Sequence, residues 1–145
     1  MKILGIGNAI VDVLCRVDDD FLIKNSLTKG TMKLIEEVEF QTLSSSLNIQ
    51  ETISGGSIAN SIVGLSKLGN DVGFIGKVNN DDLGQKYEDG LKKENVKFFY
   101  SKKKENIPTG TCLILKSIRV KRPILLLSSL NYLKKCYLIM KTMLK

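Results

Sequence analysis

The chain has 145 residues, 43% of them apolar and 26% charged, a composition typical of one globular domain with a buried core. Its formal charge of +7 lies entirely in residues 117–145, which carry seven basic and no acidic side chains, while residues 1–116 carry fifteen of each. This distribution argues against nucleic-acid binding by the first 116 residues. Because the sequence has no histidine, it excludes Ser-His and Cys-His nucleophile pairs and any histidine general base.

The first 47 residues predict strands that alternate with short helices. Apolar and β-branched runs predict strands at Lys2–Gly7 and Ile10–Val17, with a turn near Gly7-Asn8. Three consecutive aspartates begin a short helix over residues 18–24, because acidic side chains are favourable at a helix N-terminus. A strand at Thr31–Ile35 and a helix at Glu36–Leu47 follow.

The next 70 residues have the rhythm of an α/β protein. Isoleucine and leucine side chains repeat at intervals of four and three over Ser57–Leu68, and Gly69-Asn70 ends that helix. The elements expected after it are a strand at Val72–Val78, a helix from about Leu83 to Glu94, and short strands at Lys97–Ser101 and Thr109–Lys116. This order predicts a largely parallel sheet that binds ligands at the carboxyl ends of its strands.

The last 29 residues differ in composition from the rest, so we expect two segments, 1–116 and 117–145. If the second segment is helical, its apolar residues form one stripe at intervals of four and three: Leu126, Leu130, Leu133, Tyr137, Met140 and Leu144. The stripe and the basic charge allow an alternative function. The chain would then be a non-catalytic interaction protein that docks this tail on a partner helix or an acidic surface.

No segment predicts secretion or a membrane span. The N-terminal apolar run is broken by Asp12 and is expected to be a strand instead of a signal peptide. The longest uncharged run of the tail, 123–133, is shorter than the roughly 20 residues that a transmembrane helix needs. The three cysteines form no C-x-x-C pair, which argues against a disulfide framework and a zinc site. We expect a cytoplasmic protein.

Two glycine motifs resemble nucleotide-binding motifs but lack some of the residues that those motifs require. Gly5-x-Gly7 follows a strand, but Ile10 stands where a dinucleotide fingerprint needs its third glycine. Gly76-Lys77 resembles the end of a P-loop, but Asp71 replaces its first glycine and Val78 replaces the serine or threonine that would bind magnesium. A strand that ends at a turn explains both motifs.

The strongest candidate site lies where two glycines lead into the helix at Ser57. Glycine lets a ligand approach the backbone, and the free N–H groups of a helix start can bind it. Polar side chains stand at the neighbouring ends of predicted elements, where amides and carboxylates could bind hydroxyl groups. The candidate residues are Asn8, Asp12, Gly55, Gly56 and Asn60. Taken singly, turn, strand-end and helix-surface roles explain each of them.

These residues lie in segments that resemble the N-terminal part of the phosphofructokinase-B (PfkB) family of carbohydrate and nucleoside kinases. The segments are GNAIVDVLCRVDDDFL ending at Leu22, SGGSIANSIVGLSKLG at 54–69, FIGKVNNDDLG at 74–84 and, more weakly, TGTCLIL at 109–115. The resemblance covers about residues 1–116. Asn79 departs from it, since many members have glycine there, and we expect the cost to be small because asparagine tolerates a left-handed backbone.

The resemblance implies a ribokinase-like α/β fold, incomplete here, with a parallel sheet between helices and a small β lid. It assigns the binding of sugar hydroxyls to Asn8, Asp12, Gly56 and Asn60, with Gly55 beside them. The spacing of Asn8 and Asp12 is more similar to adenosine-kinase-like members, so a nucleoside or ribosyl substrate is the first choice. The lid strands expected are Ile10–Val17, Thr31–Ile35, Lys97–Ser101 and Thr109–Lys116, and a homo-oligomer could form through them.

The resemblance also implies ATP and magnesium, whose binding residues in the family lie in the C-terminal half and are absent from this chain. The catalytic aspartate of a Gly-x-Gly-Asp element is among them, and the last acidic residue here is Glu105. We therefore expect the N-terminal fragment of an ATP-dependent sugar or nucleoside kinase, inactive alone. Its tail from about residue 117 would come from a shifted reading frame or a truncation. We therefore expect no catalytic residue among these 145 residues.

Overall fold

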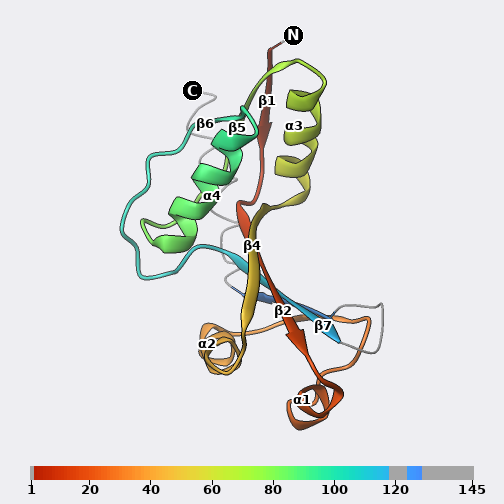
Figure 1. Ribbon diagram of the computed structural model, residues 1–145. Helices are drawn as coiled ribbons and strands as arrows, with labels where there is room; N and C mark the ends of the chain where they lie inside the picture. The colour runs from red at the N-terminus through yellow and green to blue at the C-terminus, as the bar shows by residue number, and fades with distance from the viewer. Residues whose placement is uncertain (1, 118–123, 129–145) are drawn as a thin grey trace. The chain divides into compact units, whose positions relative to one another are not determined.

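The computed structural model describes residues 2–117 and 124–128, which divide between two compact units. The first unit contains residues 2–11 and 53–110, and the second contains residues 12–52, 111–117 and 124–128. Two strands, β2 and β4, run from one unit into the other (Figure 1). None of the helices in the described ranges is long and apolar enough to cross a membrane.

The first unit is a parallel α/β layer. Its elements are β1 (Lys2–Ile6), α3 (Ser57–Lys67), β5 (Asp71–Ile75), α4 (Asp82–Lys93) and β6 (Lys97–Phe98). The sheet order is β1-β5-β6, and both strand pairs are parallel. Each helix therefore connects two strands that run in the same direction, which is the βαβ arrangement predicted from the sequence. The prediction of an incomplete α/β sheet with flanking helices is confirmed.

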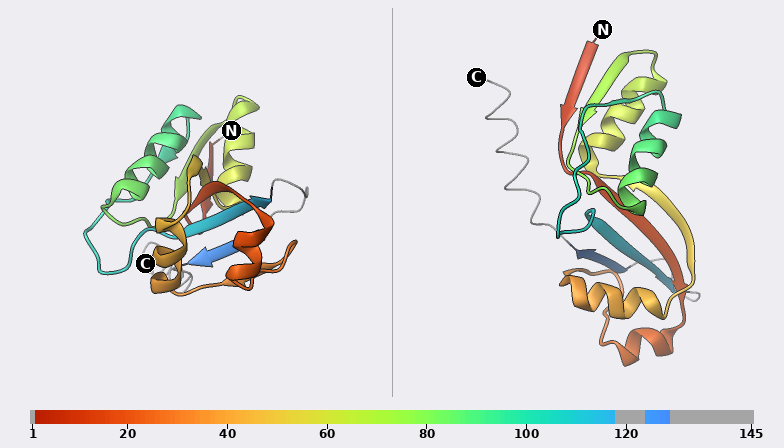
Figure 2. Two further views of the ribbon diagram at one scale, coloured as in Figure 1. Left: turned by 60° about the horizontal axis from the view of Figure 1, so that its bottom comes forward. Right: turned by 90° about the vertical axis from the view of Figure 1, so that its left-hand side faces the viewer.

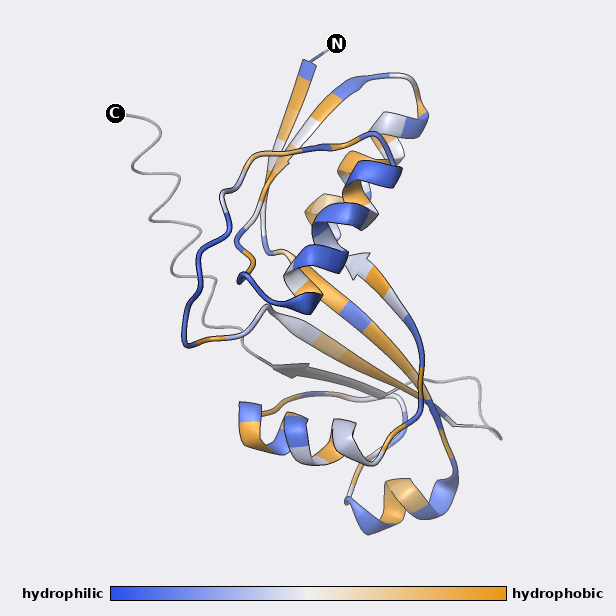
Figure 3. Ribbon diagram, turned by 60° about the vertical axis from the view of Figure 1, so that its left-hand side comes forward, coloured by the Kyte–Doolittle hydropathy of each residue, from blue (hydrophilic) through white to orange (hydrophobic). Residues whose placement is uncertain are grey.

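The strand register fixes which residues share a face of this sheet. Gly5 pairs with Phe74, and Leu4 pairs with Gly73, so the two pairs point to opposite faces. A Cβ on Gly5 would lie 2.5 Å from Ile62 of α3, and the Phe74 ring lies 6.2 Å from the ring of Tyr87 in α4. Both helices therefore cover the Gly5–Phe74 face. Figure 3 shows that hydrophilic residues occupy much of the visible side of α4.

The second unit is a mixed sheet with two short helices. Its elements are β2 (Ile10–Val17), α1 (Asp19–Lys24), β3 (Met32–Leu34), α2 (Glu37–Ser45), β4 (Ile49–Gly55), β7 (Thr111–Ser117) and β8 (Ile124–Ser128). The strand order is β3-β8-β7-β2-β4. Figure 2 shows α1 and α2 on one side of this sheet, where Leu22, Phe40 and Leu43 are buried. Alternate residues of β2, from Val11 to Val17, are also buried.

Helix starts are the best-predicted boundaries. Asp18 caps α1 by accepting a 2.8 Å hydrogen bond from Phe21 N, and Asp81 caps α4 by accepting a 2.7 Å bond from Gly84 N. The helix predicted over Ser57–Leu68 ends one residue earlier, at Lys67. The strand predicted over Val72–Val78 covers Asp71–Ile75 instead, and the three residues after it form the turn into α4.

Three strands differ from the sequence predictions. The prediction that Lys97–Ser101 belongs to the lid was wrong: only β6 forms there, and it pairs with β5 in the first unit because α4 returns the chain beside that strand. The sequence did not predict β4, in which three polar residues separate the exposed Ile49 and Ile53. Leu126 lies in β8 and not in a helix, while the other members of the tail stripe lie outside the described residues.

Candidate functional site

The carboxyl ends of β1 and β5 meet at two glycine turns in the first unit. Gly7 N donates a 3.0 Å hydrogen bond to Ile75 O, which joins the end of β1 to the end of β5. A Cβ on Gly7 would lie 2.9 Å from Ile58 Cδ1 in the first turn of α3. The turn that follows β1 therefore packs on the start of α3. This packing explains why glycines stand at Gly5 and Gly7. The sequence analysis had concluded that they are not part of a dinucleotide-binding motif.

Gly56 brings the backbone of Asn8 against this helix start. Its φ of 101° is a backbone conformation that residues with a Cβ rarely adopt. A Cβ placed there would also lie only 2.5 Å from Asn8 O. Gly56 is thus required both for the turn into α3 and for the approach of Asn8, which the sequence analysis could not derive.

The side chain of Asn8 has an unsatisfied acceptor. Its Oδ1 atom is buried and accepts no hydrogen bond from the described residues. A buried polar atom without a partner costs on the order of 1–3 kcal/mol, and such atoms are rare in folded proteins. An amide oxygen accepts the hydrogen of a hydroxyl group or an N–H group. Asn8 Oδ1 therefore has acceptor capacity, beside Gly56, that none of the described residues uses.

Gly55 and Asn60 extend the site along the same turn and helix. Gly55 is buried, and its carbonyl oxygen accepts a 3.2 Å hydrogen bond from Tyr87 Oη. Asn60 is exposed, and its backbone N donates a 2.9 Å bond to Gly56 O. The buried residues of α3 are Ala59 and Ile62, so Asn60 lies on a different side of the helix, as predicted. The support of this turn by Tyr87 of α4 was not predicted from the sequence.

Asp12 lies in β2, in the part of that strand that belongs to the second unit. It lies between the buried Val11 and Val13 of β2, so its side chain points to the other face of that strand. Burial raises the pKa of the half-buried Asp12 carboxyl. Burial also raises the pKa of the Cys112 thiol in the neighbouring strand β7 to about 12, and the negative charge of Asp12 adds to that rise.

A second polar cluster surrounds Asn79, at the carboxyl end of β5. Asn79 Nδ2 donates 2.9 Å hydrogen bonds to the carbonyl oxygens of Glu105 and Ile107, and its Oδ1 accepts from Glu105 N and from the amide of the next residue. Thr109 Oγ1 accepts a bond from Asn79 N and donates one to Asp81. The sequence analysis explained asparagine at this position by its tolerance of a left-handed backbone, and that explanation was wrong. Among the described non-glycine residues only Ser26 and Asn95 have positive φ, so the asparagine side chain is used to hold the loop 105–109.

Potential metal-binding side chains do not cluster in the part of the chain that the structure describes. In residues 2–117 and 124–128, no three histidine, cysteine, aspartate or glutamate side chains gather closely enough to bind a metal ion. Lys77, which follows the P-loop-like Gly76, is 5% exposed and forms an ion pair with Glu105. The lysine that a P-loop would present to a phosphate group is thus paired with a carboxylate here.

The parallel sheet and the helices α3 and α4 match the fold of the ribokinase-like kinases. The family described as pfkB family carbohydrate kinase matches residues 27–131. The chain therefore belongs to the pfkB family of carbohydrate kinases. The matched range continues past residue 116, where the resemblance seen in the sequence stopped, and includes β8.

Three proteins illustrate this similarity. Adenosine kinase 2 of Arabidopsis thaliana is 29% identical over 116 residues, which are 76% of this chain and 33% of that protein. A 5-dehydro-2-deoxygluconokinase of Clostridium perfringens is 48% identical over 54 residues, 37% of this chain and 16% of that protein. The crystal structure of adenosine kinase from Sinorhizobium meliloti superposes with a TM-score of 0.75 and 32% identity over 88% of this chain.

The chain spans about a third of the length of the relatives that it matches most extensively. It covers 33% of the Arabidopsis kinase and 38% of the Sinorhizobium kinase. It is thus a partial, N-terminal counterpart of an adenosine-kinase-like protein.

Proposed function

We propose that this chain carries the acceptor-binding half of an adenosine-kinase-like enzyme and binds a ribosyl group through Asn8, Asp12, Gly55, Gly56 and Asn60. The observation that carries the proposal is the buried, unsatisfied Oδ1 of Asn8 beside the glycine turn at Gly56. A ribose hydroxyl would donate to this oxygen and so remove the cost of leaving it unpaired. The exposed start of α3 would supply Asn60 and backbone N–H groups to further hydroxyls.

Asp12 would bind hydroxyl groups as a carboxylate, because an ionised carboxylate only accepts hydrogen bonds. Its raised pKa favours the protonated form, so a ligand that donates to the carboxylate would lower that pKa again. The proposed contact therefore predicts proton release when ligand binds at a pH below the raised pKa of Asp12.

The nucleoside is preferred to a simple sugar for two reasons. Two relatives that match most of this chain are adenosine kinases, at 29% and 32% identity, although a probable sugar kinase of Rhizobium etli also matches 88% of it at 30% identity. The similarity to the 5-dehydro-2-deoxygluconokinase is higher, at 48%, but covers 54 residues only. Adenosine is thus the first ligand to test, and 5-dehydro-2-deoxygluconate is the competing one.

We propose further that the 145-residue polypeptide transfers no phosphoryl group by itself. In the family this step uses ATP, and it needs a positioned base and cations beside the transferred group. This chain has no histidine, and its last carboxylate side chain, Glu105, is already paired with Lys77 and so is not a free base. Incubation of the pure chain with radiolabelled ATP and adenosine should give no labelled nucleotide, and product at a rate above the blank would contradict this part of the proposal.

A calorimetric titration tests the binding. We expect adenosine to bind with a dissociation constant of about 1 mM, which corresponds to roughly 4 kcal/mol and suits a half-formed site. Asn60→Ala should weaken this binding, while Asn48→Ala, at an equally exposed asparagine of the second unit, should not change it. Equal binding by both variants, or no heat from wild type at 10 times the expected constant, would remove the proposal.

A further inference from the structure

Tyr87 of α4 is bonded twice to the strand end that leads into the glycine turn of the candidate site. Its side chain is fully buried, and its Oη donates a 3.2 Å hydrogen bond to Gly55 O. In the opposite direction, Ser54 Oγ donates a 3.0 Å hydrogen bond to Tyr87 O. Ser54 and Gly55 are the last two residues of β4 and stand directly before Gly56. One residue of α4 therefore holds both residues that precede the turn.

The ring of Tyr87 is anchored independently of its hydroxyl group. Its centroid lies 6.2 Å from that of Phe74 in β5 and 5.8 Å from that of Phe98 in β6. The rings are tilted to one another or meet edge to face, which are favourable arrangements for aromatic pairs. A phenylalanine at position 87 would make the same ring contacts. The packing of the core therefore does not require the hydroxyl group, and its bond to Gly55 O needs another explanation.

Gly90 of α4 makes room for the second of these hydrogen bonds. A Cβ at this position would lie 2.1 Å from Ser54 Oγ and 3.1 Å from Ser54 Cβ. Gly90 stands inside α4, where glycine lowers the stability of a helix relative to alanine. The close approach of Ser54 thus explains a residue that is unfavourable for the helix itself.

The hydrogen bond to Gly55 O also fixes the direction of the next amide. Gly55 C=O and Gly56 N–H belong to one planar trans peptide unit, in which the two groups point in opposite directions. Because Gly55 O points to Tyr87 Oη, Gly56 N–H points away from that tyrosine. A peptide unit between two glycines rotates easily, since neither residue has a Cβ that restricts it. A bond from outside the turn is therefore needed to hold one orientation.

We propose that Tyr87 is a positioning residue of the candidate site, which holds the Gly55–Gly56 peptide in the orientation that binds a hydroxyl-bearing ligand. A preformed turn binds more tightly, because less conformational freedom is lost when the ligand arrives. The proposal rests on the proposed ribosyl site, since the ligand would contact the turn and Asn8 and not the tyrosine itself.

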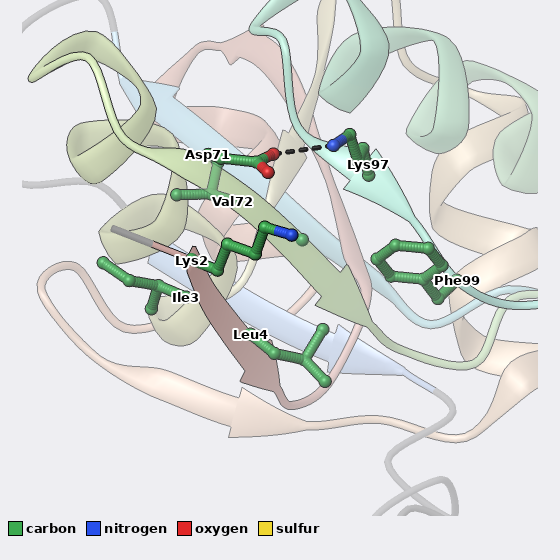
Figure 4. A pocket seen from close by; sticks show the side chains of 8 residues that line it. Lys2, Ile3, Leu4, Asp71, Val72, Lys97 and Phe99 are labelled. Atoms are coloured by element: carbon green, nitrogen blue, oxygen red, sulfur yellow. Dashed lines mark hydrogen bonds and ion pairs between the residues drawn. The ribbon is translucent and has the colours of Figure 1, made fainter.

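A cavity on the other face of the β1-β5-β6 sheet supplies a control for where the ligand binds. It has a volume of about 340 Å³, and Leu4, Gly73 and Phe99 are among its lining residues (Figure 4). Strand pairing places Leu4 and Gly73 on the face opposite to the one that α3 and α4 cover. Tyr87 does not line this cavity. A ligand bound there would therefore respond to Phe99→Ala and not to Tyr87→Phe.

Deletion of one hydroxyl group tests the proposal. Tyr87→Phe keeps the ring and removes the donor to Gly55 O. We expect the dissociation constant of adenosine, measured by nuclear magnetic resonance titration, to rise about fivefold, the effect of one typical hydrogen bond. Ser66→Ala is the matched control, because Ser66 Oγ donates a 2.8 Å hydrogen bond to Glu94 O and so joins α3 to the end of α4. It should lower the urea midpoint about as much as Tyr87→Phe and leave adenosine binding unchanged.

The amide of Gly56 in the ligand-free chain provides a second measurement. A hydrogen bond to a carbonyl polarises the amide of the same peptide unit. Tyr87→Phe should therefore shift the Gly56 amide resonance more than that of Gly64, which lies in the middle of α3. Ser66→Ala should leave the Gly56 resonance in place, whereas a general loosening of the fold would move it in both variants.

Four results would overturn the proposal. They are an adenosine affinity that Tyr87→Phe leaves unchanged, equal weakening by Ser66→Ala, weakening by Phe99→Ala alone, and a Gly56 amide that does not move in Tyr87→Phe. If the wild type binds no adenosine, the ribosyl site and the effect on affinity both fail. The Gly56 resonance of the ligand-free chain then still decides whether Tyr87 orients the turn, so the failures of the two proposals are distinguishable.

Discussion

Two polar clusters lie at the carboxyl ends of neighbouring strands in the first unit, and they differ in how completely their atoms are paired. Around Asn79 and Asp81 at the end of β5, each side-chain nitrogen and oxygen of Asn79 has a partner, and Asp81 accepts from Gly84 N, Thr109 N and Thr109 Oγ1. Around Asn8 at the end of β1, the side-chain oxygen is buried and has none. The first cluster holds the loop 105–109, whereas the second leaves a polar atom without a partner among the described residues, although each is centred on an asparagine.

The largest effect should come from the paired cluster. Asp81→Ala removes the cap of α4 and leaves the N–H groups of Gly84 and Thr109 without an acceptor. We expect the free energy of unfolding to fall by about 3 kcal/mol, the sum of a lost cap and an unpaired buried donor. Urea unfolding measures it, with the exposed Asp82→Ala as control. A loss below about 1 kcal/mol for Asp81→Ala would show that this cluster does not stabilise the fold.

A smaller loss of stability, with loss of binding, should follow at the turn beside Asn8. Gly56→Ala forces a Cβ into a φ of 101° and against Asn8 O, so we expect the free energy of unfolding to fall by about 2 kcal/mol. Gly64→Ala is the control within the same helix, because a Cβ there meets no atom within 4 Å. It should raise stability by about 1 kcal/mol. Thermal unfolding of the two variants should move in opposite directions, and parallel shifts would refute the packing described at Gly56.

Removing the unsatisfied side chain should separate binding from stability. Asn8→Ala deletes a buried acceptor that has no partner, so the free energy of unfolding should stay constant or rise by about 1 kcal/mol. Adenosine binding should nevertheless weaken, because the ligand loses that acceptor. A structural asparagine would behave in the opposite way: its loss would destabilise the chain, and binding would weaken only as far as the folded fraction fell.

The smallest effect concerns pH. Burial raises the pKa of Asp12 in the folded chain above its ordinary value, so folding favours the protonated carboxyl. The protonated carboxyl therefore contributes to the free energy of unfolding. This contribution is fully present below the pKa of Asp12 in the unfolded chain and is lost as the pH rises through its pKa in the folded chain. Adenosine binding through the carboxylate should increase over the same window. Asp12→Asn should abolish both trends in urea unfolding and calorimetry, and a variant that keeps them would assign the titration to another group.

The sequence predicted the first unit well because its signals are local. A capping aspartate marks α4, as another marks α1 in the second unit, and the periodicity of α3 marks its buried side. The strand β4 was missed because three polar residues separate its two exposed isoleucines, and β6 was placed in the wrong sheet because strand pairing depends on the crossover and not on composition. The choice of site residues came from the family motif.

The physical reasons for the site came only from the folded chain. Neither the φ of Gly56 nor the missing partner of Asn8 Oδ1 can be derived from residue types. The role of Asn79 was misjudged for the same reason, since its hydrogen bonds join it to a loop 26 to 28 residues away. Tertiary hydrogen bonding therefore decides which of the two asparagines has all of its side-chain atoms paired.

The most direct test of the ribosyl site is a titration of the isotope-labelled chain with adenosine, followed by nuclear magnetic resonance. The account predicts that the side-chain amide of Asn8 and the backbone amides of Gly56 and Asn60 shift first and saturate together, while the amides of Asn79 and Thr109 do not move. Shifts that centre on the Asn79 cluster, or an unchanged Asn8 amide at saturating adenosine, would contradict it.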